Sequence, residues 1–452
     1  MREPAFAAQR PEGVVSTSPQ ILRRRRCRRH ERQGEMVEVR RRPWFTVIML
    51  SAVYACSQLD RQIMGILLEP IKRDLGASDA QMGFLVGLAF AVFYTFLAIP
   101  IAMLADKGHR KNIIAASIIL WSAMTAVCGM ATTYLHMALA RIGVAVGESG
   151  SSPASVSMIA NLFDAETRAT AMSVFVFGAN VGMLMAFLGG GWLLDTVGWR
   201  ETFLIIGIPG IILGLMVLLL VPEPPTAPEA ATDAEKASLA STIRHMAANA
   251  PMRHILIGKS LGGFVGYGMV LWIPTFLVRS HGLSGTEIGL TLALFVGLAG
   301  GIGTLMSGRI ADFLGKRDGR WRSWSIAISK VVTIPFLLGF FLVESYELAL
   351  ALYVIPATIG AYYLAPSSAL IQQLVDDRMR AVAAAVSFFL LNMVGMGLGP
   401  QGVGLLSDLL APAYGNQSLR YALAAFVFVN LWAAFHFWRA GSLLPRRAVQ
   451  PA

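Results

Sequence analysis

Apolar stretches about as long as a membrane is thick recur along the whole chain, separated by short polar segments. Each is roughly twenty residues long, enough for a helix to cross a hydrocarbon core of ~30 Å. Only a helix satisfies its backbone hydrogen bonds within one stretch, which excludes strands. The stretches lie at residues 44–67, 81–104, 112–133, 135–162, 169–194, 201–221, 252–278, 286–311, 324–343, 348–371, 381–405 and 419–438. The pattern predicts an all-α membrane protein with twelve transmembrane helices.

The composition agrees with a surface that faces lipid. Of the 452 residues, 55% are hydrophobic and 14% are charged, whereas soluble domains carry about 25% charged residues. The three cysteines, Cys27, Cys56 and Cys128, lie far apart in the sequence. They therefore form neither a disulfide framework nor a paired zinc site, and we expect no metal and no cofactor.

The charges in the short connections predict how the chain is oriented in the membrane. Basic residues are concentrated after the second and eighth stretches: Lys107, Arg110 and Lys111 in one connection, and Lys316, Arg317, Arg320 and Arg322 in the other. The connection at 132–135 has no Lys or Arg, and the connection at 344–347 is acidic. Because short connections rich in Lys and Arg stay in the cytoplasm, we expect both termini on the cytoplasmic side of the inner membrane. The net charge of +11 mostly reflects this orientation.

Polar segments flank and divide the apolar stretches. Residues 1–42 lack hydrophobic periodicity and the apolar core of a signal peptide, and we expect a disordered cytoplasmic N-terminus in which Met36 or a nearby residue is an alternative start. The basic run at 23–33 precedes a membrane helix, which is typical of an orientation anchor rather than of nucleic-acid binding. Residues 223–250 begin with Pro, Ala and acids and are predicted to be a cytoplasmic linker. This linker separates two six-helix bundles, 43–222 and 251–440, and a short cytoplasmic tail, 441–452, follows.

The two predicted bundles repeat one another. The second stretch is followed by AMLADKGHRK (102–111) and the eighth by GRIADFLGKR (308–317), which share a small residue, three residues, Asp and a basic turn. The fourth stretch is followed by DAETRATAMS (164–173) and the tenth by DDRMRAVAAAVS (376–387). Two matched connections in the same order predict a duplicated six-helix unit.

These motifs resemble those of the major facilitator superfamily, in which Gly-x-x-x-Asp-Arg-x-Gly-Arg-Arg joins helices two and three. Within it, LDR (59–61) and RIGVAVGESGSSPASVSMIANLF (141–163) are similar to the Spinster family, and the resemblance covers nearly all of the predicted bundles. It implies a conformational latch formed by Asp106, Arg110 and Lys111 in the first half and by Gly308, Asp312, Lys316 and Arg317 in the second. In the first copy, Ala102 and His109 stand where the family usually has glycine.

Six charged residues fall inside the apolar stretches: Asp60, Arg61, Arg141, Glu148, Lys259 and Lys330. A charge at a helix centre costs about 2.5–3.5 kcal/mol on insertion scales, so it normally faces the bundle interior beside a partner. Arg141 and Glu148 are two turns apart on one helix face, whereas the neighbours Asp60 and Arg61 point about 100° apart and cannot satisfy each other. We therefore expect Asp60 and Arg61 to pair with Arg141 and Glu148.

Two interpretations of this cluster remain open. It is either a set of ion pairs that fixes helix packing, which need not stabilise the fold, or a proton switch, because intramembrane carboxylates mark proton and substrate pathways. We assign Asp60, Arg61, Arg141, Glu148 and Lys259 to proton coupling and substrate binding. Lys259 either lines the cavity or lies nearer the interface, and Lys330 either faces the cavity or extends to the interface.

The second half has no counterpart of the charged cluster when the repeats are aligned. Its expected cavity lining is largely aromatic: Tyr267, Trp272, Tyr362, Tyr363 and Asn392. Ordinary helix packing explains each aromatic side chain equally well. A cavity that is charged on one wall and apolar on the other suits an amphiphile, and the Spinster resemblance implies lysolipids or sphingoid lipids as substrates.

Enzyme chemistry is not expected. GESGSS (147–152) lacks the second glycine of a nucleophile elbow, and the chain has neither His-Glu-x-x-His nor a Walker lysine. We predict a monomeric, proton-coupled secondary transporter that moves an amphipathic substrate across the lipid bilayer by alternating access. The alternatives are a transporter of a small organic anion or drug-like compound and a non-transporting membrane sensor.

Overall fold

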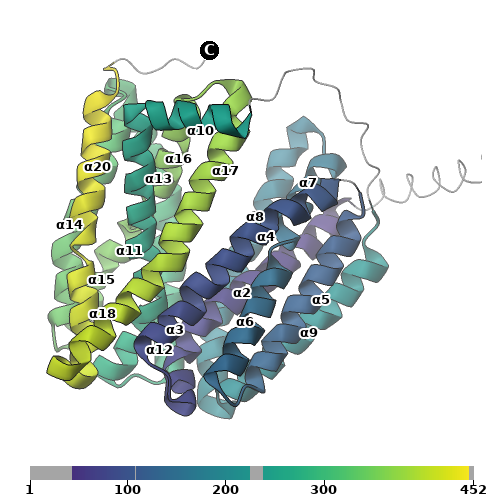
Figure 1. Ribbon diagram of the computed structural model, residues 1–452, viewed down its shortest axis with the longest axis vertical. Helices are drawn as coiled ribbons and strands as arrows, with labels where there is room; N and C mark the ends of the chain where they lie inside the picture. The colour runs from purple at the N-terminus through teal and green to yellow at the C-terminus, as the bar shows by residue number, and fades with distance from the viewer. Residues whose placement is uncertain (1–42, 107, 224–237, 447–452) are drawn as a thin grey trace, which may run out of the picture.

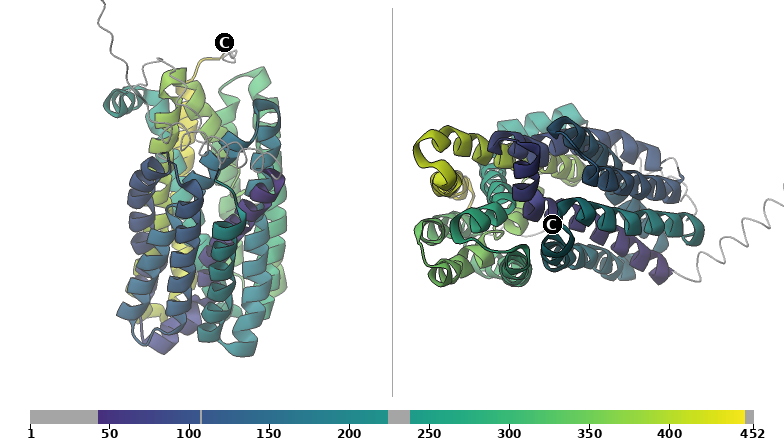
Figure 2. Two further views of the ribbon diagram at one scale, coloured as in Figure 1. Left: turned by 90° about the vertical axis from the view of Figure 1, so that its right-hand side faces the viewer. Right: turned by 90° about the horizontal axis from the view of Figure 1, so that it is seen from below.

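The computed structural model describes residues 43–106, 108–223 and 238–446. Within these ranges the chain is helical, without strands, and forms two bundles that lie side by side (Figures 1 and 2). The expectations for residues 1–42, including the basic run and the alternative start, lie outside the described residues.

The first bundle consists of six spans, of which the second and the fourth are divided into shorter helices. The spans are α2 (Pro43–Leu75); α3 (Asp79–Gly83), η1 (Phe84–Leu88) and α4 (Ala89–Asp106); α5 (Arg110–Gly129); α6 (Tyr134–Glu148) and α7 (Ser151–Leu162); α8 (Ala165–Val197); and α9 (Trp199–Leu220).

The second bundle repeats this plan after a short helix, α10 (Leu239–Ala248), which lies within the predicted linker. Its spans are α11 (Ala250–His281); α12 (Gly285–Leu292), η2 (Ala293–Ala299) and α13 (Gly300–Arg317); α14 (Trp321–Leu342); α15 (Tyr346–Ile359) and α16 (Leu364–Gln373); η3 (Asp377–Met379), α17 (Arg380–Leu390), η4 (Leu391–Leu398) and α18 (Gly399–Tyr414); and η5 (Gly415–Gln417), α19 (Ser418–Phe426) and α20 (Val429–Leu443).

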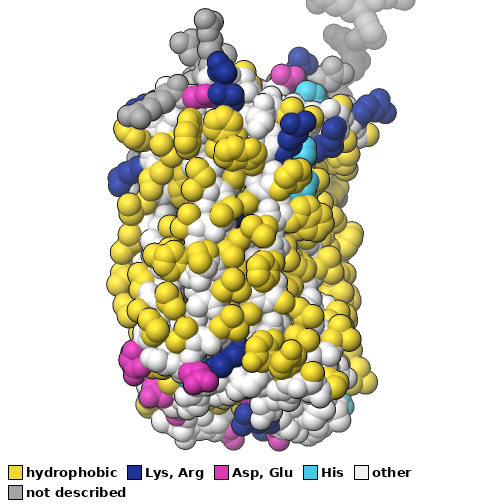
Figure 3. Space-filling view, turned by 90° about the vertical axis from the view of Figure 1, so that its left-hand side faces the viewer, with side chains coloured by type: hydrophobic (Ala, Val, Ile, Leu, Met, Phe, Trp, Pro, Cys, Tyr) yellow, Lys and Arg dark blue, Asp and Glu magenta, His cyan; other side chains and the backbone are white. Residues whose placement is uncertain are grey.

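The surface between the two ends of the molecule is apolar. Nine helical segments among the described residues are long and apolar enough to cross a membrane, and one of them, 377–443, is long enough for two passes. Leu219, Leu305 and Leu409 are 79%, 74% and 75% exposed, and charged side chains gather near the two ends (Figure 3). Together with α2 and the broken pair α6–α7, these segments make up the twelve predicted spans.

The alternation of the spans defines two ends. The terminal end holds Pro43, Leu443 and the connections that carry the repeated motifs, and the far end holds the other connections. Three spans contain a π-helical segment, η1, η2 and η4, which the hydrophobic pattern did not predict. Such segments are common at functional sites. Here η1 and η4 face each other across the two halves, because a Cβ at Gly87 would lie 2.6 Å from the carbonyl oxygen of Gly397.

Small residues bring the spans of each bundle close together. On α8, a Cβ at Gly178 or Gly182 would overlap the backbone carbonyl of Ser51 or Ala55 on α2. Such close approach of helices is typical of membrane bundles, where packing rather than water drives association.

We expect Gly182→Ala to destabilise the first bundle by about 1–3 kcal/mol, because the added methyl forces α8 away from α2. Gly189→Ala on the same helix is the matched control, since nothing lies within 4 Å of a Cβ there. Thermal unfolding of the purified variants in detergent measures the difference. Equal midpoints for the two variants would show that the α2–α8 contact does not limit stability.

Candidate functional site

Four charged side chains form a cluster inside the first bundle, where α2 meets α6. Arg61 Nε donates to Glu148 Oε2 at 2.6 Å, and Arg141 Nη1 lies 3.6 Å from Asp60 Oδ1. The two neighbours on α2 thus each pair with a residue of α6, as the helical spacing predicted. Asp60, Arg141 and Glu148 are 2%, 2% and 1% exposed, whereas the side chain of Arg61 is 21% exposed.

The two carboxylates of the cluster are only partly satisfied. Thr125 Oγ1 on α5 donates to Asp60 Oδ2 at 2.6 Å, and Ser57 Oγ donates to Glu148 Oε2 at 3.3 Å. The other oxygen of each carboxylate, and Nε and Nη1 of Arg141, have no hydrogen-bond partner among the described residues. Buried polar atoms are rarely left in this state. The site therefore has unused capacity for a proton, a water molecule or a ligand.

Arg61 extends from the buried cluster to two aromatic rings of the second span. Its guanidinium lies 4.3 Å from the ring centroid of Tyr94 and 5.1 Å from that of Phe90, both on the second span. These rings stabilise the cation on its apolar side, while Glu148 pairs with it on the other.

Asp60 also lines a cavity of about 250 Å³ that lies among α2, α5, α8 and α9. Its walls are mostly apolar and include Cys56, Leu59, Trp121, Met185, Gly189, Gly190 and Ile205. Met185 and Ile205 are 54% and 44% exposed, so the mouth of the cavity lies on the outer face of the first bundle. The sequence analysis did not predict this cavity.

The second bundle does not present the aromatic wall that the sequence analysis expected. Trp272 is fully buried and donates from Nε1 to the carbonyl oxygen of Pro400 at 2.9 Å, so its prediction as a cavity-lining residue is wrong. Tyr362 is 6% exposed and donates to Ser325 Oγ on α14 at 3.0 Å. Both side chains bury an apolar ring and satisfy their polar atom inside the bundle, the usual behaviour of packed Trp and Tyr.

The remaining predicted lining residues differ in exposure. Tyr363 and Asn392 are 4% and 3% exposed, and Asn392 Nδ2 has no partner among the described residues. Tyr267 is 36% exposed and is the one predicted lining residue that remains accessible.

The two lysines predicted at membrane depth both lie inside the second bundle. Lys259 Nζ donates to Ser368 Oγ and to Ser387 Oγ, each at 2.9 Å. Lys330 Nζ donates to the carbonyl oxygen of Gly360 at 3.3 Å. The structure thus separates Lys259 from the four charged side chains of the first bundle, with which the sequence analysis had grouped it.

The first copy of the repeated motif runs into the start of α5, which Glu223 caps. The backbone N–H groups of Arg110 and Lys111 each donate at 2.8 Å to the carboxylate of Glu223, and Arg110 Nε donates to Ser157 Oγ at 2.9 Å. His109 has φ of 68°, the left-handed conformation that glycine adopts without strain. The side chain of Asp106 lies outside the description, so its predicted latch role stays a prediction.

The second copy is more open. The side chain of Asp312 is 74% exposed and lies 3.9 Å from Arg322 of the same bundle. Lys316 is exposed, a Cβ at Gly308 would meet nothing within 4 Å, and the side chain of Arg317 lies outside the description. In this conformation the described latch residues make no polar contact with the opposite half.

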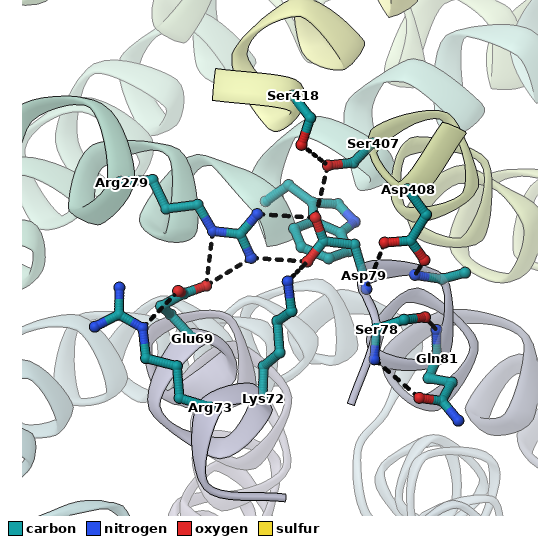
Figure 4. A network of polar contacts seen from close by, with 12 residues as sticks. Glu69, Lys72, Arg73, Ser78, Asp79, Gln81, Arg279, Ser407, Asp408 and Ser418 are labelled. Atoms are coloured by element: carbon teal, nitrogen blue, oxygen red, sulfur yellow. Dashed lines mark hydrogen bonds and ion pairs between the residues drawn. The ribbon is translucent and has the colours of Figure 1, made fainter. Parts of the chain in front are cut away.

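A polar network that the sequence analysis missed joins the two halves at the far end (Figure 4). Arg279 on α11 donates to Glu69 on α2 at 2.9 and 2.7 Å and to Asp79 on α3 at 2.8 and 2.7 Å. Lys72 also pairs with Asp79, at 2.6 Å. Because the side chains of Glu69, Asp79 and Arg279 are at most 7% exposed, these ion pairs are shielded from water.

Two helix beginnings at the far end are capped by acids from the opposite half. Asp408 on α18 accepts from the backbone N–H groups of Asp79 and Ala80 at 3.0 and 2.8 Å. Asp195 on α8 accepts from the N–H groups of Gly285 and Thr286 at 2.8 and 2.7 Å. Carboxylates at helix N-termini are stabilised by the free N–H groups and the helix dipole. The fifth span thus caps the eighth, and the eleventh caps the second.

All hydrogen bonds and ion pairs that join the halves among the described residues lie at this far end. Two repeated six-helix bundles, joined at one end and containing a buried charged cluster, define a transporter-like class of membrane protein. Such repeats work by moving against each other around a central site.

Comparison with known proteins gives the family. Residues 50–400 match the Major Facilitator Superfamily, and the chain belongs to it. It is 34% identical over 413 residues to an MFS-type efflux pump of Mycolicibacterium smegmatis, a match that covers 91% of this chain and 96% of that protein. It is also 26% identical over 413 residues to protein spinster homolog 1 of Xenopus tropicalis, covering 85% and 78% of the two chains.

A solved structure shows the same architecture. The crystal structure of a bacterial homolog of the human lysosomal transporter Spinster, in an inward-facing and unoccupied conformation, superposes with a TM-score of 0.80 at 28% identity. The match covers 88% of this chain and 97% of that chain. The superfamily membership expected from the motifs is therefore confirmed, and the similarity to Spinster proteins agrees with the resemblance in the sequence.

We expect Arg279→Met to favour opening of the far end, because removing one partner of a buried ion pair costs about 3–5 kcal/mol. Spin labels at the exposed positions Met130 and Glu344, one at the far end of each half, report the separation by double electron–electron resonance. Arg73→Met is the matched control, since Arg73 also pairs with Glu69 but its side chain is 67% exposed and on the same helix. Unchanged distances in Arg279→Met would show that the network does not hold the halves together.

Proposed function

We propose that this protein is a proton-coupled secondary transporter that moves an amphipathic substrate of the lysolipid or sphingoid type. It acts as a monomer in the cell membrane with both termini in the cytoplasm. The observation that carries the proposal is the buried cluster of Asp60, Arg61, Arg141 and Glu148, in which each carboxylate keeps an unsatisfied oxygen. A purely structural ion-pair cluster is expected to satisfy its lone pairs more fully.

The proposed coupling step is the protonation of Glu148. A proton there removes the charge that holds Arg61 at 2.6 Å, and the guanidinium then loses its ion pair but keeps its contacts with the neighbouring rings. Arg61 is the most exposed member of the cluster, so its release alters the surface that a substrate meets. The ion pair of Arg141 with Asp60 lies on the same two helices, so a proton on Glu148 is expected to affect Asp60 as well, and the two carboxylates should titrate as a unit.

The proposed orientation in the membrane implies a conformational state for this structure. With the basic connections in the cytoplasm, the far end faces outward, and the Arg279 network closes it. The conformation is then inward-facing, as in the bacterial Spinster homolog whose structure it resembles. Alternating access requires that the far-end network break while the terminal end closes.

A second candidate function is export of drug-like compounds or small organic anions. The similarity to an efflux pump and the apolar cavity beside Asp60 favour it. Similarity to a Spinster protein supports the amphipathic substrate instead. Both candidates share the proton-coupling step.

We expect Asp60→Asn and Glu148→Gln each to reduce pH-gradient-driven uptake into liposomes to near the level of protein-free vesicles. Each change removes a proton-binding group without changing side-chain volume. Uptake is measured for a panel of lysolipids and drug-like cations, with and without an imposed pH gradient. Arg141→Ala should be more harmful, because it leaves buried acids without a counter-charge.

Glu344→Gln is the matched control, since Glu344 is an exposed acid at the far end. Size-exclusion chromatography of each variant separates loss of function from loss of folding. Full gradient-driven uptake by both carboxamide variants would contradict proton coupling through this cluster. Absence of any gradient-driven uptake by the wild-type protein for every compound would favour a non-transporting sensor.

A further inference from the structure

Lys259 is a buried cation whose partners do not account for its charge. It lies on α11 with 7% of its surface exposed, and its ammonium donates to Ser368 on α16 and to Ser387 on α17. An ammonium group has three N–H donors. Two are used, and both acceptors are neutral hydroxyls, so one donor and the whole positive charge have no partner among the described residues.

The three helices that carry Lys259 and its two serine partners contain no acid to balance this charge. None of α11, α16 and α17 contains an Asp or Glu. No carboxylate lies within 4.0 Å of Lys259 in the described part of the chain. The cations of the first bundle differ, because Arg61 and Arg141 each have an acid beside them.

Lys330 shows how a buried lysine in this bundle is stabilised without an acid. Its ammonium donates to the carbonyl of Gly360, the C-cap residue that follows α15, and lies 4.1 Å from the ring centroid of Tyr363. The C-terminus of a helix carries a partial negative charge, and the aromatic face adds to it. Lys259 has neither a helix terminus nor a ring beside it among the described residues, so a bound anion would supply a counter-charge that these residues lack.

One side of the Lys259 surroundings is accessible. Ser368 is exposed, and so are the small residues Ala365 and Ala369 on the same face of α16. The Ser387 hydroxyl accepts from Lys259 but donates to nothing in the described residues, so its hydrogen is available. The span that carries Ser387 faces the first bundle, since Phe389 packs edge-on against Phe96 of α4 at 5.7 Å between ring centroids (Figure 1).

We propose that Lys259 and Ser387 bind the anionic head group of a singly charged amphiphile, a lysophospholipid with one net negative charge or a fatty acid. Ser368 positions the ammonium, since its own hydroxyl donates to the carbonyl oxygen of Leu364 at 2.7 Å. One ammonium balances one negative charge, and the free N–H and O–H groups supply two donors to its oxygens. This inference rests on the proposed transport function but concerns binding alone. It places the head group on the second half, and the charged cluster of the first half remains free to bind protons.

The test is equilibrium binding to the purified full-length protein in nanodiscs at constant pH. The probes share one acyl chain: lysophosphatidylglycerol and the fatty acid carry a negative charge, and the monoacylglycerol is neutral. Lys259→Met should weaken binding of both anions by about tenfold to about a hundredfold, the range for a hydrogen bond to a charged group. Binding of the neutral probe should not change, and Lys259→Arg should restore a preference for the anions.

Lys330→Met is the matched control, because it removes the other buried lysine, which already has its own counter-charge. Ser387→Ala gives a second measure should Lys259→Met fail to fold, and it should weaken anion binding selectively while keeping the charge. Equal losses for anionic and neutral probes, or no preference for anions in the wild-type protein, would overturn the proposal. The same selective loss in Lys330→Met would overturn it as well.

Inorganic phosphate and a short-chain carboxylate separate this inference from the proposed substrate class. If they compete as strongly as the long-chain anions and Lys259→Met abolishes the competition, the anion site stands and the amphipathic substrate fails. Because binding at constant pH needs no gradient, failure of proton coupling leaves this test intact.

Discussion

Hydrocarbon offers no hydrogen bonds and stabilises charge poorly, so each polar group within the spans depends on a partner inside the protein. For the buried charged side chains of this chain, at least one partner comes from a different helix. Polar pairs therefore decide which helices can separate and at what energetic cost. The far-end network satisfies its members fully, with two acids around Arg279. The cluster around Asp60 and Glu148 leaves an oxygen of each carboxylate without a hydrogen-bond partner within the described part of the chain. A proton can change the balance of charge there.

At the far end, each half caps a helix N-terminus of the other half with a carboxylate. Asp408 caps the beginning of the second span, and Asp195 caps the beginning of the eighth. Each cap is a carboxylate on the fifth span of one repeat and a helix N-terminus on the second span of the other. The symmetry means that a rotation of one half breaks both caps together. The ion pairs of Arg279 with Glu69 and Asp79 have no equivalent in the other repeat among the described residues, so the contacts between the halves are not fully symmetric.

The sequence was most informative where helical geometry and the cost of buried charge act together. Spacing alone placed Arg141 and Glu148 on one face of their span, and charge balance paired them with Asp60 and Arg61. It was least informative for aromatic residues, because an apolar span has no periodicity that separates a cleft-facing ring from a packed one; Trp272 is the clear case. The Arg279 network was missed because Glu69 and Asp79 stand at span ends, where acids normally face water. Only the way the two halves meet brings them together.

Glu223, the first residue of the predicted linker, contacts a connection that is distant in the sequence. It caps the first turn of α5 through the N–H groups of Arg110 and Lys111, and it is the last described residue before the segment that leads to the second half. A displacement of Glu223 therefore reaches the end of α9 through the backbone and the start of α5 through these two hydrogen bonds. Glu223 thus couples the end of the sixth span to the connection between the second and third spans, where the first copy of the repeated motif lies.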